Sequence, residues 1–532
     1  MAWQAPELGR LHPTAMVLAV VLAVGAGLLG RWWWLRTPYD IGAAPIRGLW
    51  RWPRMGWYLR PFLGWWEGPL GLPIFAMGRE EDSVGTVGPP RVNKTSGSGI
   101  AQALLWGGAL ISVSQTPLLM RKTGRRRRLL AKLFGGRVLV YAPTSTGGKV
   151  EGLVPVRFSP CSADANEVTL RVESWITAAE TSKNVEDQGH WQTGAGFVLR
   201  GLMWAAAHHP TRPGDFTLVY DWIVAALAGD KLTRDHALDE PLGILWGRSS
   251  WDGNTFAKGL AAVNGAAEKE RASFMTASLA TIKAAVNPAV LSSTAATDFD
   301  IERFILTRST LYIVSPTEHQ RAVAPLIAML VETIVHTAYR LYREGKLGPR
   351  EKPLRIRLGL QLDDLANVAP LPQLESIISQ GGGQGVNVFW SLQSLAQLSQ
   401  HYGREAAQAI WSATRCKVVF GGLTDQASIS ELSEAIPEER VVVAGESNTD
   451  KGPKGSKHVS WRKLLSAAQL REIPSGWSLL VYLNLRARML RQPLAHKRGV
   501  LARQMLPWAA IEDELEQPPL HVVRDDEEEE VA

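Results

Sequence analysis

The sequence predicts an α/β protein with a largely parallel sheet, an inserted all-α domain and a membrane-spanning helix ahead of both. Three observations predict this fold: apolar runs of strand length that alternate with helical segments, one long stretch of helical periodicity inside that pattern, and an apolar stretch near the first residue. A chain of 532 residues is long enough for several domains with their own cores. Its 58 Lys and Arg against 51 Asp and Glu give a net charge of +7, which permits nucleic acid or anionic lipid as a partner.

The apolar stretch at residues 13–35 predicts one transmembrane helix. Its apolar part needs the Trp residues at 32–34 to reach the roughly 20 residues that span a bilayer. A cleaved signal peptide is the alternative, but Arg31 and Arg36 lie on the wrong side of the apolar part for that. Further arginines follow as far as Arg60, so the positive-inside rule places the main part of the chain in the cytoplasm.

Trp and Arg residues remain frequent after this helix, and we assign residues 1–79 to a membrane anchor with a Trp/Arg-rich juxtamembrane segment. Indole rings favour the headgroup zone of a bilayer. Residues 49–77 therefore either lie along the membrane surface or form a short second hairpin, and the sequence leaves both alternatives open. The anchor is accordingly single-pass or two-pass.

Mixed α/β patterning begins at residue 80. Helical segments such as 324–345 separate most of the apolar runs, which is typical of a parallel sheet wrapped by helices. We assign residues 80–166 and 296–500 to one discontinuous α/β domain. The runs of strand length are 109–114, 137–142, 309–314, 354–362, 386–392, 416–422 and 477–483.

Residues 167–295 interrupt this pattern because nearly all of them have helical periodicity, and we predict an all-α domain inserted there. The last segment, 501–532, ends in a run of acidic residues. A solvated, disordered tail is the plainest interpretation of such a run.

Cysteine and histidine positions do not favour a metal site. Cys161 and Cys416 are far apart in the sequence, which excludes a disulfide framework and indicates a reduced compartment. His208 and His209 have no further ligand at metal spacing, so we interpret them as residues at the end of a helix.

The stretch GPPRVNKT at residues 88–95 has the spacing of a phosphate-binding loop. It supplies Gly88, Lys94 and Thr95 at the required positions, and a helical segment and a strand follow it. Asn93 replaces the last glycine of such a loop. The residue before the lysine often needs a positive φ, which Asn tolerates better than most residues. Its side chain would crowd the phosphates, so we expect reduced nucleotide affinity or turnover.

A second stretch, PTSTGGKVEG at residues 143–152, places a glycine beside Lys149. Val150 takes the place of the hydroxyl residue, and Pro155 prevents a helix from following directly. We interpret this stretch as a turn after the strand at 137–142 and the stretch at 88–95 as the nucleotide loop.

Two carboxylates follow the strand predicted at 354–362. Asp363 and Asp364 would lie at the carboxyl edge of the sheet, where open α/β sheets bind ligands. Asp363 would hold a metal ion, and Asp364 would orient or deprotonate an attacking water. Gln393 ends a nearby strand and would sense the terminal phosphate. The alternatives are an Asp pair that caps the next helix and a glutamine that forms a turn.

Several of these segments resemble the ATPase motifs of type IV coupling proteins, the membrane-anchored motors that bring DNA to a conjugative secretion channel. The actinobacterial forms are the most alike, and the resemblance covers roughly residues 60–495. It rests on GPPRVNKT at 88–95, LQLDDLANVAPLPQLESIISQGGGQGVNVFWSLQSLAQLSQHYG at 360–403, and TRCKVVFGGLTD at 414–425.

The resemblance implies a RecA-like P-loop NTPase in the bacterial inner membrane, which hydrolyses ATP with Mg²⁺ and moves DNA. Lys94 would act on the phosphates, Thr95 and Asp363 would hold Mg²⁺, and Asp364 and Gln393 would complete the catalytic set. The inserted domain would meet DNA, a relaxase or another secreted protein at the cytoplasmic mouth of a homo-hexamer that docks on channel components. The residues implied to bind ATP are Gly88, Pro89, Pro90, Arg91, Asn93, Lys94 and Thr95.

Three features depart from the family pattern. Asn93 replaces glycine, Asp364 replaces the usual glutamate, and residues 381–384 lack the arginine that many relatives carry there. Arg415 is a weak substitute for that arginine. These departures favour a second hypothesis, a recruitment platform with the same fold that hydrolyses ATP weakly or not at all. The intact Lys94 favours the ATP-driven pump.

Two further segments have a plain interpretation beside a functional one. The basic segment 121–132 would contact DNA phosphates or would simply be a solvated helix face. The glycines at 381–383 predict a flexible turn, because no lysine follows them as a nucleotide loop would require.

Overall fold

The computed structural model describes residues 59–67, 73–144, 154–179, 188–348, 355–368 and 371–492, apart from isolated positions within the longer ranges. The predicted transmembrane helix at 13–35 and the acidic tail at 501–532 lie outside these residues, as does most of the stretch at 143–152.

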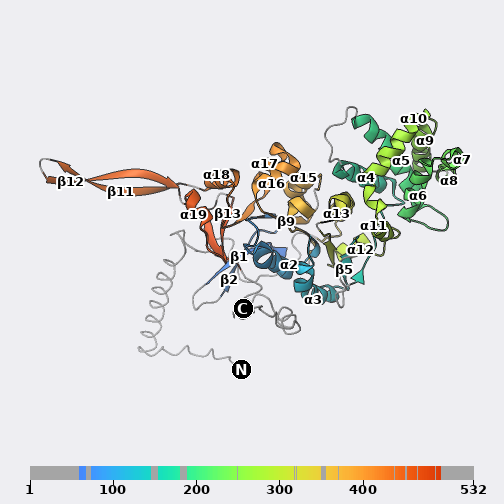
Figure 1. Ribbon diagram of the computed structural model, residues 1–532. Coiled ribbons are helices and arrows are strands. Elements are labelled where there is room, and N and C mark those ends of the chain that lie inside the picture. Colours follow the sequence, from blue (N-terminus) through green and yellow to red (C-terminus); the bar gives the residue numbers. More distant parts are fainter. Residues whose placement is uncertain are drawn as a thin grey trace, which may run out of the picture.

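Within the described residues, twelve strands form one sheet in the order β2-β1-β14-β13-β10-β3-β9-β8-β4-β7-β5-β6 (Figure 1). All neighbours from β10 to β6 are parallel, which confirms the predicted largely parallel sheet. Every predicted run contains a strand. These strands are β4 (Ala109–Ser114), β5 (Val138–Tyr141), β7 (Thr310–Val314), β8 (Leu358–Leu362), β9 (Val386–Leu392), β10 (Cys416–Phe420) and β13 (Trp477–Tyr482).

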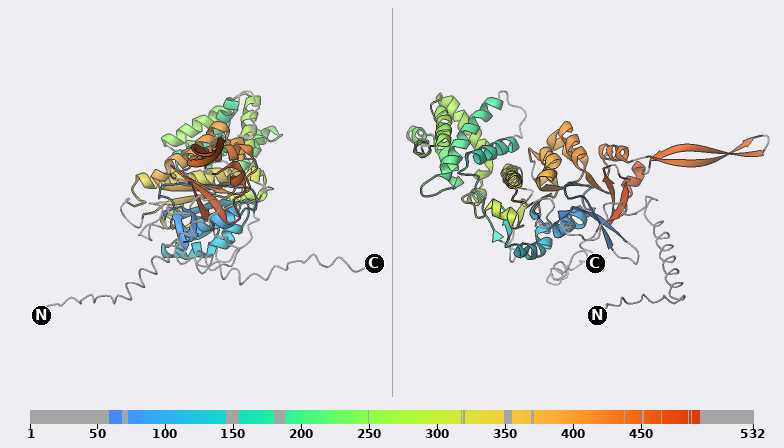
Figure 2. Two further views of the ribbon diagram at one scale, coloured as in Figure 1. Left: turned by 90° about the vertical axis from the view of Figure 1, so that its left-hand side faces the viewer. Right: turned by 180° about the vertical axis from the view of Figure 1, so that it is seen from behind.

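The central strands are buried on both faces, which explains their continuous apolar sequences. In β4, Ile111 and Val113 belong to the main core, whereas Leu110 packs on the other face with Trp106. The helices α2 (Ile100–Leu105) and α3 (Leu118–Leu133) cover this second face (Figure 2). The opposite face carries α13 (Gln320–Arg343), α14 (Leu365–Val368), α15 (Leu374–Gln380), α16 (Leu395–Tyr402) and α17 (Arg404–Ala413).

Part of the segment expected at the membrane surface belongs to the sheet. The strands β1 (Phe62–Glu67) and β2 (Pro73–Met77) form an antiparallel hairpin, and β1 pairs with β14 (Arg488–Arg491). Trp65 is 6 % exposed in this hairpin, so its indole ring packs inside the protein. The sheet therefore begins about twenty residues before the boundary expected from composition.

Between β6 (Val154–Pro155) and β7 the chain is helical and forms a body at one end of the molecule (Figure 1). Asp215 and Asp230 cap two of its helices by accepting hydrogen bonds from backbone N–H groups. Its helices are α4 (Ala165–Ala179), α5 (Gln188–Ala207), α6 (Phe216–Ala226), α7 (Lys231–His236), α8 (Asp239–Trp246), α9 (Trp251–Asn264), α10 (Glu268–Thr281), α11 (Pro288–Ser293) and α12 (Ile301–Leu306).

A second, unpredicted feature projects from the other end of the molecule. The strands β11 (Glu438–Thr449) and β12 (Gly452–Lys463) form a two-stranded antiparallel sheet of their own. They extend away from the body between α18 (Gln426–Ala435) and α19 (Ala467–Arg471) (Figure 1).

Helix α13 is the one described helix that is long and apolar enough to cross a membrane by length and composition. In its most apolar window 83 % of the residues are buried against the sheet and α4, so it is a core helix of this fold.

Candidate functional site

The predicted nucleotide loop leaves the carboxyl end of β3 (Val84–Val87), a four-residue strand between β10 and β9. The backbone N–H of Gly88 donates to the carbonyl of Leu392 at 3.2 Å, which fixes the start of the loop. A Cβ at Gly88 would lie 2.8 Å from the Cβ of Phe420, so only glycine fits here. The loop then enters a π-helical turn, Lys94–Gly99, which runs directly into α2.

Two non-glycine residues of this loop adopt a left-handed backbone conformation. Asn93 has φ 67° and Arg91 has φ 66°. The positive φ predicted for Asn93 is therefore present, and the loop reaches a glycine-like conformation without glycine at either position. Arginine lacks the short polar side chain that lets Asn or Asp favour this conformation through a local hydrogen bond. The left-handed conformation therefore costs Arg91 on the order of 1 kcal/mol.

Lys94 folds back over the loop. Its Nζ donates to the carbonyls of Gly88 and Pro89, the second at 2.9 Å. Burial lowers the pKa of Lys94, while the nearby Asp364 and Asp363 act in the opposite direction. The ammonium group is thus held at the centre of the loop, where the phosphates of a nucleotide would lie.

Thr95 and Asp363 meet across the sheet edge. The Thr95 hydroxyl donates to the carboxylate of Asp363, with Oγ1 3.0 Å from Oδ1 and 2.9 Å from Oδ2. The Ser391 hydroxyl also donates to Oδ1, at 3.0 Å. Burial raises the pKa of Asp363, and these two hydrogen bonds oppose that rise.

This donor set fits a Mg²⁺ ion. A hydroxyl and a carboxylate are the hard oxygen ligands that Mg²⁺ prefers, and a bound cation would offset the burial of the Asp363 carboxylate. No group of three or more His, Cys, Asp or Glu side chains at metal-binding distance occurs among the described residues. A Mg²⁺ ion here would therefore need waters or ligand phosphates in addition to Thr95 and Asp363.

Asp364 lies beside this pair and is held by amide side chains. It adopts φ 62°, and its backbone N–H donates to the Ser391 hydroxyl at 2.9 Å. Gln393 Nε2 donates to Asp364 Oδ2 at 3.1 Å, and Gln115 Nε2 donates to the same oxygen at 3.4 Å. The structure thus brings Gln393, the residue predicted to sense the terminal phosphate, next to the carboxylate pair.

These side chains surround a hollow of about 310 Å³ at the carboxyl ends of β3, β4, β8 and β9. Five lining residues were not predicted, and two of them, Gln115 and Ser391, hydrogen-bond to the carboxylate pair. Gln115 directly follows the strand at 109–114, and a polar side chain just after an apolar run is the signal that would have found it. The hollow is lined by Pro90, Arg91, Asn93, Lys94, Thr95, Ser96, Gln115, Thr116, Leu118, Asp363, Asp364, Ser391 and Gln393.

Two features considered as sources of a catalytic arginine lie at the opposite end of the strands. Arg415 precedes β10, and its guanidinium lies 3.5 Å from the carboxylate of the buried Asp82. The glycine turn Gly381–Gln384 precedes β9, where a Cβ at Gly382 would lie 2.1 Å from the carbonyl of Glu81. The turn is tightly packed at Gly382, and neither feature lies at the nucleotide loop of this chain.

The two histidines lie just after α5. His208 Nδ1 is 2.9 Å from the carbonyl of Trp204, and His209 Nε2 is 3.1 Å from Glu240 Oε1. This placement agrees with their interpretation as helix-end residues.

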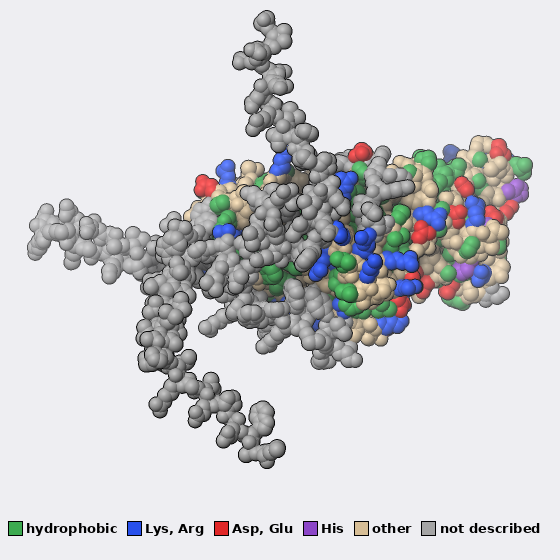
Figure 3. All heavy atoms as spheres, turned by 90° about the horizontal axis from the view of Figure 1, so that it is seen from below, with side chains coloured by type: hydrophobic (Ala, Val, Ile, Leu, Met, Phe, Trp, Pro, Cys, Tyr) green, Lys and Arg blue, Asp and Glu red, His purple; other side chains and the backbone are tan. Residues whose placement is uncertain are grey.

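The basic segment forms α3, and Lys and Arg side chains gather over this helix in the view from below (Figure 3). Arg121, Arg125 and Lys132 are exposed. Arg127 is fully buried instead and donates to the carbonyls of Trp106 and Gly108, so it is a structural residue.

A parallel sheet with a Lys–Thr loop at one strand and a carboxylate pair at the next but one defines a P-loop NTPase. The chain belongs to the family described as type IV secretory system conjugative DNA transfer, which matches residues 59–517. The predicted likeness to type IV coupling proteins is thereby confirmed.

Solved structures of the conjugative coupling protein TrwB share this fold. The unbound form has a TM-score of 0.55 at 18 % identity and covers 79 % of this chain and 86 % of that one. The complex with ADP and Mg²⁺ has a TM-score of 0.56 at 17 % identity and covers 82 % and 90 %. The complex with an ATP analogue, ADPNP, has a TM-score of 0.55 at 18 % identity and covers 80 % and 88 %. No curated protein matches the sequence significantly.

Proposed function

We propose that this coupling protein is a membrane-anchored ATPase that recruits DNA, as a relaxase-bound strand, and pumps it into a type IV secretion channel. The observation that carries the proposal is the contact between Thr95 and Asp363, which assembles a Mg²⁺ site beside the ammonium group of Lys94. TrwB has been solved with ADP and Mg²⁺ and with an ATP analogue, which supports ATP and Mg²⁺ as the ligands of this hollow.

The residues at the hollow have distinct roles in this proposal. Lys94 exchanges the carbonyls of Gly88 and Pro89 for the β- and γ-phosphates of ATP. Thr95 and Asp363 hold Mg²⁺, which neutralises charge on the phosphates when it is bound. The backbone N–H groups that the rest of the loop offers to the phosphates belong to residues 91–93. Pro89 and Pro90 have no backbone N–H, and that of Gly88 donates to Leu392.

Asp364 and Gln393 form the catalytic and coupling pair. Asp364 orients the attacking water and accepts its proton, and Gln393 transmits the state of the site because its amide already holds Asp364 Oδ2. The anchor at residues 1–79 attaches the protein to the inner membrane. The domain at 167–295 meets DNA or a secreted protein at the cytoplasmic mouth of a homo-hexamer.

A second candidate function is a recruitment platform that binds ATP but hydrolyses it slowly. The observation that favours it is the restraint on Asp364, whose Oδ2 accepts from both Gln393 and Gln115. Asp364 is also one methylene shorter than the glutamate of related proteins. Asn93 adds a side chain to the loop where a glycine would leave room for phosphates.

ATP hydrolysis by the full-length protein in detergent micelles, with and without single-stranded DNA, distinguishes the two functions. We expect DNA-stimulated turnover that Lys94→Ala lowers by at least about 100-fold, because the phosphates lose a fixed positive charge. Lys149→Ala, in the alternative loop, is the control and leaves turnover unchanged. If the wild-type protein binds ATP without any turnover, the platform is the correct function.

A further inference from the structure

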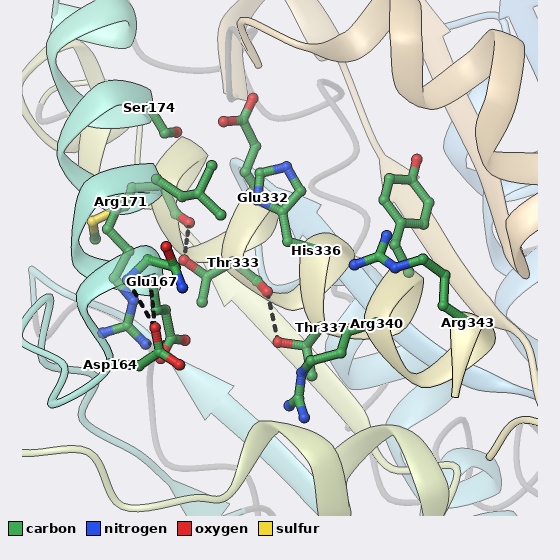
Figure 4. A pocket seen from close by; sticks show the side chains of 14 residues that line it. Asp164, Glu167, Arg171, Ser174, Glu332, Thr333, His336, Thr337, Arg340 and Arg343 are labelled. Atoms are coloured by element: carbon green, nitrogen blue, oxygen red, sulfur yellow. Dashed lines mark hydrogen bonds and ion pairs between the residues drawn. The ribbon is translucent and has the colours of Figure 1, made fainter. Parts of the chain in front are cut away.

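A second cleft lies between α4 of the inserted helical body and α13 of the core, and it shares no lining residue with the nucleotide hollow. Its volume is about 620 Å³, within the range of small-molecule sites. Figure 4 shows polar side chains from both helices around it. Since α4 and α13 make the most extensive contact between the two bodies, the cleft lies at their junction.

The inner wall of the cleft carries two buried polar groups that lack hydrogen bonds. Glu332 is 1 % exposed, and its Oε1 accepts from the backbone N–H of Gln373 at 3.1 Å. Among the described residues, neither Glu332 Oε2 nor the hydroxyl of Ser174 has a hydrogen-bond partner. Ser174 lies close enough to moderate the raised pKa of Glu332 without reaching hydrogen-bond geometry. Such orphaned groups are rare in native proteins and point to a ligand that completes them.

The carboxyl group of Glu332 is suited to bind an uncharged part of a ligand that both donates and accepts hydrogen bonds. Burial raises the pKa of this carboxyl, so it retains its proton to a higher pH than an exposed glutamate would. A protonated carboxyl donates from one oxygen and accepts at the other, as the edge of a nucleobase requires. Figure 4 shows Ser174 on α4 beside the carboxyl group of Glu332 on α13, so the two groups present a joint polar surface to the cleft.

The face of α13 that carries Glu332 continues along the cleft to two arginines, Arg340 and Arg343, at the cleft opening. Residues 332, 336, 339, 340 and 343 recur at helical spacing, so they form one strip. The rings of His336 and Tyr339 lie 6.4 Å apart on this strip and offer flat surfaces. Arg340 and Arg343 are exposed at its end. Within the described part of the chain, Arg340 lies 3.4 Å from the Glu302 carboxylate and 3.6 Å from that of Glu344, both loose ion pairs.

We propose that this cleft binds a nucleotide, with its base against Glu332 and Ser174 and its phosphate at Arg340 and Arg343. The rings of His336 and Tyr339, which lie between these two ends, pack against the base or the sugar. The ligand is either a free nucleotide or one residue of a DNA strand, since both present the same base and phosphate. The inference goes beyond ATP hydrolysis and does not depend on it.

Calorimetric titration of the full-length protein tests this assignment. The Lys94→Ala variant is the background for every measurement, because it removes binding at the nucleotide loop. The probes are the four deoxynucleoside monophosphates and a four-residue single-stranded oligonucleotide. We expect at least one probe to bind. Ser174→Ala or Glu332→Gln should weaken this binding, or change the preference between bases, by at least about fivefold. Arg343→Ala should weaken it by about tenfold and reduce its dependence on salt concentration.

Arg303, an exposed arginine on α12, does not line the cleft, so Arg303→Ala is the matched control and leaves binding unchanged. Thermal unfolding of each variant separates lost binding from lost structure. Binding of monophosphates assigns the cleft to free nucleotides, and binding of the oligonucleotide alone assigns it to a DNA strand. The proposal is overturned if no probe binds, if Ser174→Ala and Arg343→Ala both leave binding unchanged, or if the cleft takes an acidic peptide such as residues 524–532 instead.

Discussion

The two ends of the parallel strands carry the same kinds of polar side chains in opposite settings. At the carboxyl ends, Thr95, Asp363 and Gln393 line an open hollow, where Thr95 hydrogen-bonds to Asp363 and Gln393 to the neighbouring Asp364. At the amino ends, Asp82 is fully buried and accepts from the Tyr482 hydroxyl at 2.5 Å. The comparison shows that access to open space, rather than residue type, separates the site from the scaffold.

The amino-end network is extensive and buried. Arg357 donates to Asn387 Oδ1 at 2.7 Å and to the carbonyl of Gly382. Asn387 in turn donates to the carbonyls of Glu80 and Asp82, at 2.7 and 2.8 Å. This network joins β9 and its glycine turn to the segment ahead of β3, and its side chains Asp82, Arg357 and Asn387 are buried. We therefore expect substitutions there to change stability, and substitutions at the carboxyl ends to change turnover.

Asp363→Asn provides the largest expected effect on turnover. ATP hydrolysis should fall by at least about 100-fold, because the amide cannot supply the charge that holds Mg²⁺. Steady-state hydrolysis at saturating Mg²⁺ measures it. A variant with near-normal turnover would remove Asp363 from the metal site.

The same substitution should make the ligand-free protein more stable. Burial raises the folded-state pKa of Asp363 above its unfolded value, so its contribution favours folding at low pH and is lost as the pH rises through the folded pKa. The amide that replaces the carboxyl group does not titrate, so the melting temperature of the variant should exceed that of the wild type above this pKa. Melting curves from pH 5 to 8 without ATP and Mg²⁺ measure the difference, and an unchanged pH profile would contradict it.

Tyr482→Phe tests the buried network at the amino ends of the strands. The change removes a hydroxyl that donates to the buried Asp82 carboxylate, and we expect a loss of about 2 kcal/mol in the free energy of unfolding. Turnover per folded molecule should stay within about twofold of the wild type. Urea unfolding and hydrolysis assays of the same preparation separate the two quantities. A large loss of turnover at full stability would show that the two ends are coupled.

Arg91→Gly tests how the phosphate loop uses its unusual residues. Glycine adopts φ 66° without strain, so the ligand-free protein should gain roughly 0.5 to 1 kcal/mol in stability. Because Arg91 lines the hollow, ATP affinity should fall about tenfold when its charge is lost. Equilibrium binding of a fluorescent ATP analogue gives the affinity, and Arg91→Lys should restore part of it. Equal affinity in all three forms would place Arg91 outside the phosphate contacts.

The smallest expected effect belongs to Asn93→Gly. Asn93 already adopts the required backbone conformation, so the substitution changes only the side chain next to the phosphates. We expect ATP affinity or turnover to rise by up to about fivefold, with stability changed by less than about 1 kcal/mol. A decrease in both would show that the Asn93 side chain contacts the nucleotide.

The central sheet could be predicted because strands buried on both faces are continuous apolar runs, as in β4 and β9. Lys94, Thr95 and Asp363 could be predicted because the loop spacing and a strand-end carboxylate pair are local patterns. Gln115 was missed because its partner, Asp364, lies 249 residues away and only the folded sheet brings them together.

The unpredicted strands are those whose local sequence suggests another environment. The hairpin of β1 and β2 is rich in Trp and lies next to a predicted membrane helix, so its composition favours a bilayer interface. Only its pairing with β14, more than 400 residues further on, makes it part of the sheet. The hairpin of β11 and β12 has many Gly, Ser and Lys residues and no alternating apolar pattern that would indicate a strand.

The acidic residue on the cleft face of α13, Glu332, also affects whether this helix would insert into a membrane. Helix α13 is apolar enough to be taken for a membrane span, yet in the finished protein it is buried against the sheet. A charged residue at the centre of such a helix raises the free energy of its insertion into a bilayer by about 2.5 to 3.5 kcal/mol. Glu332 lies near that centre, so its ionised form should disfavour insertion of α13 into a bilayer relative to packing on the sheet.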